Sequence, residues 1–135
     1  MVNNPNDRQT VATYLQAAHQ ALAGSQHNLN ADFYGIAVNR AYYAVFYAAN
    51  ALLITKGLTR SKHSGTVSAF RQFFVKPGLI EPEYSDIYGS LMDDRHVSDY
   101  DMGTAIESQR AETDVQDAHR FVERIETYLR REKWL

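Results

Sequence analysis

Cysteine is absent from this 135-residue chain, which excludes disulfides, thiolate catalysis and zinc sites built on thiolates. An excess of charge of one sign is also lacking: the formal net charge is −2, so no bulk positive field drives non-specific binding to nucleic acid. Binding to nucleic acid would therefore require a local patch of basic side chains. A chain without cysteine fits a reducing compartment, and we predict a cytoplasmic protein.

Membrane and export signals are missing as well. The longest apolar run, 41–54, contains Asn50 and several tyrosines, and it is shorter than the roughly 20 apolar residues that a bilayer requires. Residues 1–6 carry neither the basic segment nor the apolar stretch of a signal peptide. We expect them to form a flexible leader, and we predict no membrane association.

Common catalytic motifs do not occur either. The chain has no glycine-rich phosphate loop, no GxSxG turn and no HExxH pair. The histidines are scattered, without the helical spacing of metal ligands: His19, His27, His63, His96 and His119. We therefore predict neither a metal site nor a cofactor.

What the chain does have is a helical repeat of apolar residues along nearly its whole length. Predicted helices cover about 7–23, a second stretch capped by Asn30 or Asp32 and running to about 56, and then 64–75, 82–94 and 107–133. Gly24 and Gly57 end the first two. No alternation typical of strands competes with this pattern. We predict one all-α domain over 1–135, an antiparallel, up-and-down bundle of four main helices plus one short helix.

The second predicted helix is apolar over most of its circumference. One stripe contains Tyr34, Ala37, Val38, Ala41, Tyr42, Val45, Phe46, Ala49, Leu52 and Leu53, and the adjoining face adds Tyr43, Ala44, Tyr47, Ala48 and Ala51. A helix of this kind is buried on more than one side. Either it is central in its own bundle or part of it meets another subunit, and we predict a homodimer.

Arg40 lies beside this apolar helix face, one turn before Tyr43. A guanidinium group near a core requires an anionic partner, because burying it alone is very costly. One interpretation is a structural salt bridge to an acid of another helix. The other is a cleft in which Arg40 accepts an anionic ligand.

A second polar stretch, DDRHVSDYD at 93–101, lies where the fourth predicted helix ends. Arg95 and Asp99 are four residues apart and share a face if the helix continues. This stretch is either a local ion pair with a helix cap or a functional rim. On the second interpretation, Arg95, a proton-transferring group in His96 or Asp99, and the phenol of Tyr100 gather there.

A third, weaker feature is SKHSG at 61–65. Lys62 and His63 precede the short predicted helix, where basic groups and free backbone N–H groups form a phosphate site. The alternative is a solvated loop in which Ser61 or Ser64 caps the helix.

Taken in order, four segments resemble the small HEPN-domain proteins of bacteria and archaea. They are NRAYYAVFYAANALL (39–53), SKHSGTVSAFRQFFVKPG (61–78), RHVSDYD (95–101) and AHRFVERIETYL (118–129), and the resemblance extends over about residues 10–129. It implies a helical bundle that dimerises through long helices. It also implies a frequent pairing with a minimal nucleotidyltransferase, in toxin–antitoxin or defence-type systems.

Many HEPN proteins are metal-independent ribonucleases whose motif is an arginine, four to six intervening residues and a histidine. Arg95 matches the arginine of that motif, but Tyr100, Asp101 and Met102 stand where the histidine is required. The resemblance therefore favours a module that binds a nucleotide or RNA without cleaving it. The alternatives are a ribonuclease toxin that uses Arg95, His96 and Asp99, or a purely structural dimerisation domain.

The expected ligand site is one polar cleft between the second and fourth helices. Its predicted residues are Arg40, Tyr43, His63, Arg95, Asp99 and Tyr100. Tyr100 is in addition a candidate for nucleotide attachment by the partner enzyme, because toxin members of the family carry a tyrosine beside their motif.

Overall fold

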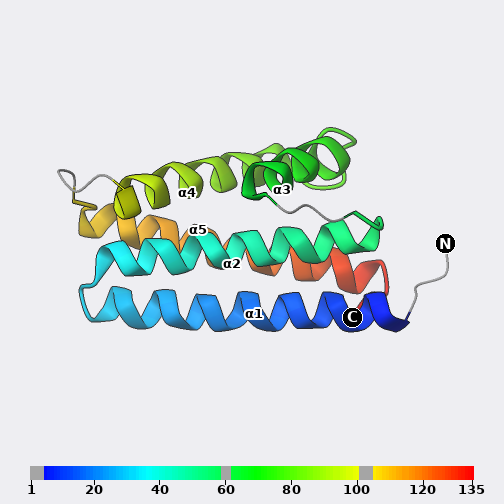
Figure 1. Cartoon of the computed structure of the whole chain (residues 1–135), viewed down its shortest axis with the longest axis horizontal. Helices are drawn as coiled ribbons and strands as arrows, with labels where there is room; N and C mark the ends of the chain where they lie inside the picture. The colour runs from blue at the N-terminus through cyan, green and yellow to red at the C-terminus, as the bar shows by residue number, and fades with distance from the viewer. Residues whose placement is uncertain (1–4, 59–61, 101–104) are drawn as a thin grey trace.

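The computed structural model describes residues 5–58, 62–100 and 105–135. These residues form α1 (Pro5–Asn30), α2 (Tyr34–Thr55), α3 (His63–Phe70), α4 (Pro82–Tyr100) and α5 (Ser108–Arg131). A π-helical turn, η1 (Arg71–Val75), follows α3 directly, and the described ranges contain no strand. The four long helices alternate in direction (Figure 1). The predicted all-α bundle of four main helices and one short helix is confirmed.

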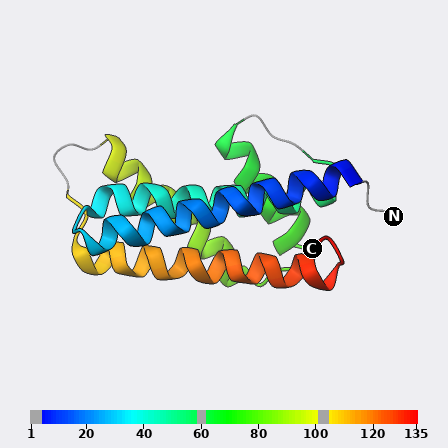
Figure 2. The ribbon, with the colours of Figure 1, turned by 90° about the horizontal axis from the view of Figure 1, so that it is seen from below.

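Helix α2 lies at the centre of the bundle, where it packs against α1, α3, α4 and α5 (Figure 2). Its alanines let neighbouring helices approach closely, and the side chains of Tyr42, Val45 and Leu52 are fully buried. The prediction that α2 is buried on more than one side is therefore confirmed within a single chain. Because its own bundle accounts for this burial, the homodimer stays a prediction.

Helix α1 is longer than predicted at both ends. It begins at Pro5, where a proline fits the first turn of a helix, so the expected leader is wrong for residues 5 and 6; residues 1–4 lie outside the described part of the chain. It also continues past Gly24 to Asn30. The chain reverses instead at Asp32, which has a left-handed φ of 65°.

Gly24 has a packing role inside α1. A Cβ atom at this position would lie 3.6 Å from Cδ of Arg40, so the aliphatic part of the arginine crosses α1 here. This is an ordinary contact distance, so an alanine would also fit here, and the helix continues through Gly24 despite the low helix propensity of glycine. At the end of α2 the prediction was better, because Gly57 has a left-handed φ of 69° just beyond the last helical residue.

Helix α4 also differs from the prediction, since it continues beyond Asp94 to Tyr100. Contacts with α2 hold this last part in place, among them a hydrogen bond from Ser98 Oγ to the carbonyl oxygen of Gly35, 3.1 Å long. The predicted third helix is α-helical only to Phe70, and the π-helical turn takes up the rest. No helix within the described ranges is long and apolar enough to cross a membrane.

Candidate functional site

Two guanidinium groups meet at the ring of Tyr43. The Cζ atom of Arg40, from α2, lies 4.9 Å from the ring centre, and the Cζ atom of Arg95, from α4, lies 5.5 Å from it. Arg95 also donates a hydrogen bond from Nη2 to the Tyr43 hydroxyl at 3.3 Å. The structure thus brings together two arginines that are far apart in the sequence.

A chain of side-chain hydrogen bonds connects the two arginines. Arg40 donates from Nε and Nη2 to the side-chain oxygen of Asn39, at 3.1 and 3.0 Å. Nδ2 of Asn39 donates to Oδ2 of Asp99 at 3.0 Å, and Nε of Arg95 donates to the same oxygen at 3.0 Å. Asp99 and Arg95 therefore form the ion pair that their spacing in the sequence predicted.

Arg40 has a different partner from the one that a structural salt bridge requires. Within the described ranges its guanidinium contacts Oδ1 of the Asn39 side chain and the Tyr43 ring, and it pairs with no carboxylate. Within the same described ranges, the N–H groups of Arg40 and Arg95 that do not take part in the hydrogen bonds named above have no hydrogen-bond partner. A guanidinium carries several donors in a planar fork, so both side chains retain donors for a ligand.

His63 is the third basic residue in this part of the molecule. Its ring stacks on Phe46 with ring centres 4.1 Å apart, and Nδ1 shares a 2.8 Å hydrogen bond with the Tyr42 hydroxyl. The rings of Tyr42 and Tyr43 contact both His63 and the guanidinium of Arg95. The structure therefore places His63 beside the arginine cluster, as we call Arg40 and Arg95 together with the residues that connect them, Asn39, Tyr43 and Asp99. No side-chain cap of α3 from Ser64 is formed, and Ser61 lies outside the described residues.

Burial controls the protonation of the groups around His63. Burial, and secondarily the positive charge of Arg95, lowers the pKa of His63 below its usual value. Burial also raises the pKa of Tyr42 to about 12, although Arg95 opposes this shift. At neutral pH the pair is therefore a neutral imidazole and a neutral phenol, and the positive charge of the cluster resides on the two arginines.

Tyr100 and His96 lie at the exposed end of α4. The Tyr100 ring is within reach of Arg95, whose Cζ atom is 5.8 Å from the ring centre, yet the residue is 64% exposed. The exposed His96 packs against Tyr100, with ring centres 5.1 Å apart. Tyr100 thus borders the cluster, whereas the described contacts of His96 do not include Arg95. Asp101 and Met102 lie outside the described residues.

Sequence reasoning missed two members of this arrangement. Asn39 joins Arg40 to Asp99, and Tyr42 anchors His63, but neither was singled out. Asn39 has no charge to attract notice, and Tyr42 belongs to an apolar stripe that indicates core packing. Spacing offered one signal, because Asn39, Tyr42 and Tyr43 lie within one helical turn.

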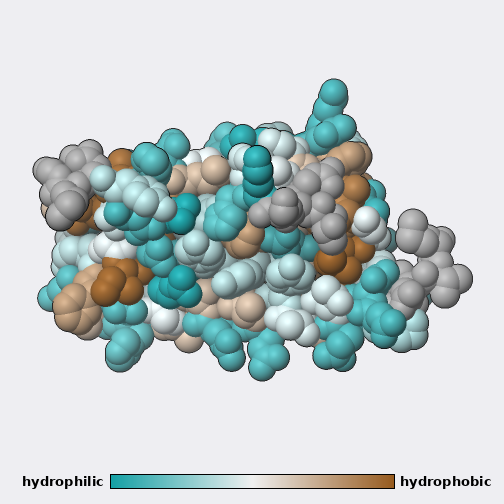
Figure 3. Space-filling model, in the orientation of Figure 1, coloured by the Kyte–Doolittle hydropathy of each residue, from teal (hydrophilic) through white to brown (hydrophobic). Residues whose placement is uncertain are grey.

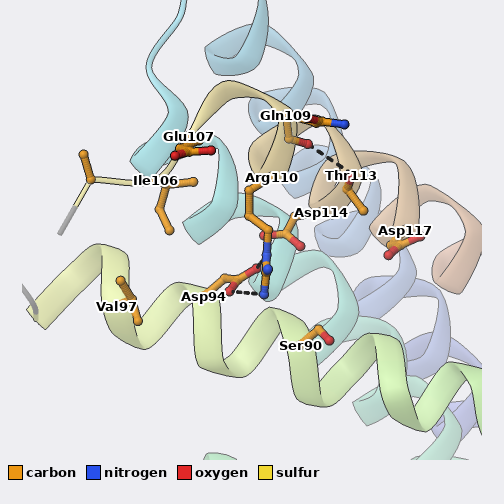
Figure 4. A pocket seen from close by; sticks show the side chains of 11 residues that line it. Ser90, Asp94, Val97, Ile106, Glu107, Gln109, Arg110, Thr113, Asp114 and Asp117 are labelled. Atoms are coloured by element: carbon orange, nitrogen blue, oxygen red, sulfur yellow. Dashed lines mark hydrogen bonds and ion pairs between the residues drawn. The ribbon is translucent and has the colours of Figure 1, made fainter.

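A second polar cluster, between α4 and α5, was also missed. It lies in a cavity of about 730 Å³ (Figure 4), into which Arg110 reaches to form a bidentate pair with Asp94 at 2.7 and 2.9 Å. Asp114 is only 2% exposed, and its Oδ2 has no hydrogen-bond partner among the described residues. Burial first, and then the hydrogen bond and charge of Asp94, raise the pKa of Asp114. Because Arg110 already supplies the positive charge that these carboxyl groups require, this second polar cluster serves to join α4 to α5.

The chemistry open to the arginine cluster is the binding of anions. Two guanidiniums with spare donors suit the oxygens of a phosphate or carboxylate group. Among the described residues, no group of three or more His, Asp or Glu side chains is arranged to hold a metal ion. The surrounding face is largely polar, with hydrophobic surface confined to separate patches, one of them over the start of α2 (Figure 3).

Comparison with known proteins identifies relatives that match most of this chain. A protein of Methanocaldococcus jannaschii named "Putative toxin" is 34% identical over 94% of this chain and 94% of its own length. A second protein of that name from the same organism is 32% identical over 85% of this chain and 78% of its own length. A UPF0332 protein of Thermotoga maritima is 34% identical over 92% of this chain and 95% of its own length.

The family model described as the HEPN domain matches residues 11–131. This range contains most of α1 and all of α2, α3, α4 and α5, and hence every residue of the arginine cluster. The helical bundle described above is the architecture that the resemblance implied. The chain is a member of the HEPN domain family.

Proposed function

We propose that this chain is a toxin-like HEPN module that binds a phosphate group of a nucleotide or RNA at Arg40 and Arg95. The observation that carries the proposal is the meeting of both guanidiniums at the Tyr43 ring, each with donors to spare. Two like charges beside one ring repel each other, and an anion that binds to both reduces the repulsion. The names of the relatives supply the toxin-like part of the proposal.

Asp99 is compatible with an anionic ligand because its own charge is already compensated. Arg95 and Asn39 both donate to its Oδ2, at 3.0 Å each. Arg40 then contributes the positive charge that no described carboxylate balances. The cluster of two arginines and one aspartate therefore carries a net positive charge, and it is this excess that a phosphate group neutralises.

A module that binds without cleaving is the first choice, because Tyr100, Asp101 and Met102 stand at the three positions where the ribonuclease motif has its histidine. A metal-independent ribonuclease is the second candidate, and one observation favours it: His63 is neutral and contacts the same two tyrosine rings as Arg95. A neutral imidazole beside a guanidinium is able to take a proton from a ribose hydroxyl while the arginine stabilises the charge on phosphorus oxygens.

A homodimer and a nucleotidyltransferase partner complete the proposal. Tyr43, Phe46 and Tyr47 form a row of contacting rings on α2, with ring centres 5.8 to 6.0 Å apart. Each of the three is only partly buried. Aromatic side chains of this kind are enriched where subunits meet, so a second copy of the chain is the occupant we expect over this row.

The phosphate site is tested by titrating the protein with inorganic phosphate and with a short RNA. We expect Arg40→Ala and Arg95→Ala each to weaken binding of both ligands by about tenfold or more, since each removes a charge-assisted contact. Arg131→Ala is the matched control, because Arg131 is exposed on α5, and it should bind as the parent does. Equal affinities of all four proteins would rule out the arginine cluster as the site.

The choice between binding and cleavage is tested separately. Purified protein is incubated with total RNA in the presence of EDTA, beside the Arg95→Ala and His63→Ala variants. We expect intact RNA in every sample. RNA decay with the parent protein that is lost in both variants would establish the ribonuclease instead.

A further inference from the structure

Beside the arginine cluster lies a smaller groove, between the first turn of α2 and the last turn of α4. It has a volume of about 370 Å³ and is lined by Gly35, Ile36, Asn39, Ser98 and Asp99. Two of these residues, Asn39 and Asp99, are also members of the hydrogen-bond chain that connects Arg40 with Arg95. The groove and the proposed phosphate site are therefore adjacent.

The groove depends on the absence of a side chain at Gly35. A Cβ atom there would lie 2.7 Å from Oγ of Ser98, which is closer than such atoms approach in proteins. The Ser98 hydroxyl instead donates to the Gly35 carbonyl oxygen at 3.1 Å. The Ser98 side chain thus lies directly against the backbone of α2 at the base of the groove.

The walls of the groove differ in chemistry. Ile36 provides an apolar side chain that is 53% exposed. Asp99 provides a charged side chain. Its Oδ2 accepts hydrogen bonds from Asn39 and Arg95, whereas among the described residues its Oδ1 has only a long contact of 3.4 Å with Asn39. An apolar surface beside a carboxylate oxygen with acceptor capacity suits a flat ligand whose edge donates N–H groups.

We propose that this groove receives a nucleobase, and that Asp99 selects guanine because guanine directs two adjacent N–H donors at Oδ1, the carboxylate oxygen that still has acceptor capacity. Adenine, cytosine and uracil present no such pair on their pairing edge. Ile36 covers one face of the base, and the attached phosphate extends toward Arg40 and Arg95. This inference rests on the proposed phosphate site, which it extends from a phosphate group to a guanine nucleotide.

The test compares the affinities of GMP, IMP, AMP and inorganic phosphate, measured by calorimetric titration of the full chain. IMP lacks only the exocyclic amine of guanine, so the ratio of the GMP and IMP affinities isolates that hydrogen bond. We expect GMP to bind about tenfold more tightly than IMP or AMP, and phosphate to bind most weakly. In Asp99→Asn, which keeps the shape but replaces one acceptor by a donor, the GMP and IMP affinities should agree within about twofold.

A surface variant separates the groove from the phosphate site. Ile36→Ser should weaken GMP about fivefold through lost apolar contact while leaving inorganic phosphate unchanged. Leu79→Ser, at another exposed apolar residue, is the matched control and should leave both unchanged. Equal affinities for GMP, IMP and AMP would overturn the guanine inference and leave the phosphate site intact. Absence of binding to phosphate and to every nucleotide would overturn both.

Discussion

At the scale of single residues, Tyr43 has the most specific role. Its ring lies next to two guanidiniums, and its hydroxyl accepts a hydrogen bond from Arg95. The electron-rich face of the ring offsets part of the repulsion between the two cations, which is a favourable contribution of roughly 0.5–2 kcal/mol for each contact. Tyr43 therefore keeps both arginines in position before a ligand arrives.

This role predicts a graded loss of phosphate binding. Tyr43→Phe removes the hydroxyl but keeps the ring, and should weaken binding of inorganic phosphate about threefold. Tyr43→Ala removes both and should weaken it by about tenfold or more. Tyr84→Phe changes a partly buried tyrosine outside the cluster and serves as the control. The role is refuted if Tyr43→Ala binds phosphate as tightly as the parent in calorimetric titration.

The sequence predicted which residues belong to the arginine cluster better than it predicted the hydrogen-bond partners of those residues. Arg40 stood out because a guanidinium group near an apolar stripe requires a partner, and Arg95 because of its spacing from Asp99 and its match to the family motif. The structure places both at one ring. The partner of Arg40 was not predictable, since the choice between a distant carboxylate and Asn39 depends on how α2 faces α4. An uncharged amide gives no signal of that kind in a sequence.

At the scale of helices, the errors in the predicted ends have one physical origin. Gly24 suggested an end for α1 and the polar run after Asp94 suggested an end for α4, but both helices continue for about two turns. Contacts between helices outweigh local propensity at these places: Arg40 packs across Gly24, and Asn39 bonds to Asp99. Apolar periodicity, by contrast, located every long helix because it reports the buried face.

Two glycine substitutions test this interpretation. In Gly24→Ala the new methyl group meets Arg40 at an ordinary contact distance of 3.6 Å, so the better helix propensity of alanine should raise the free energy of unfolding by about 0.5–1 kcal/mol. Gly57→Ala forces an alanine into a left-handed φ of 69° and should lower it by about 1 kcal/mol. Urea denaturation measures both. A destabilised Gly24→Ala would contradict the packing described for this crossing.

The cluster that joins α4 to α5 predicts a dependence of stability on pH. Burial, followed by Asp94, raises the pKa of Asp114 to about 8, above its value of about 3.9 in an unfolded chain. The folded state therefore holds a proton that the unfolded state releases. The stability that this proton provides is complete below pH 4 and is lost as the pH rises to about 8.

Asp114→Asn is the corresponding variant, because it keeps the shape of the protonated carboxyl group and cannot ionise. It should match the parent near pH 4 and exceed its melting temperature by at least about 5 °C at pH 8.5, because the parent loses stability throughout this range. Asp94, Arg110 and Asp117 also act on Asp114, so Asp86→Asn, an exposed site on α4, controls for a general effect of removing charge. A difference between Asp114→Asn and the parent that is the same at both pH values would show that Asp114 is not the titrating group.

At the scale of the whole molecule, one chain buries the core but leaves one side of α2 incompletely covered. Tyr43, Phe46 and Tyr47 contact one another and all remain partly exposed. The arginine cluster adjoins the same row through Tyr43. A second copy packed there would bury the aromatic edges and bring two phosphate sites close to one symmetry axis.

The oligomeric state therefore has a specific test. Light scattering after size-exclusion chromatography should give twice the chain mass of 15.4 kDa for the parent protein. Tyr47→Glu should shift it to a monomer, because a carboxylate buried against its symmetry mate has no partner. Tyr14→Glu places the same charge at a partly buried tyrosine on α1 and should leave the dimer intact. Circular dichroism on both variants separates loss of the dimer from loss of the fold. If the parent itself elutes as a monomer at high concentration, the row on α2 has another occupant, and the phosphate site must work within one chain.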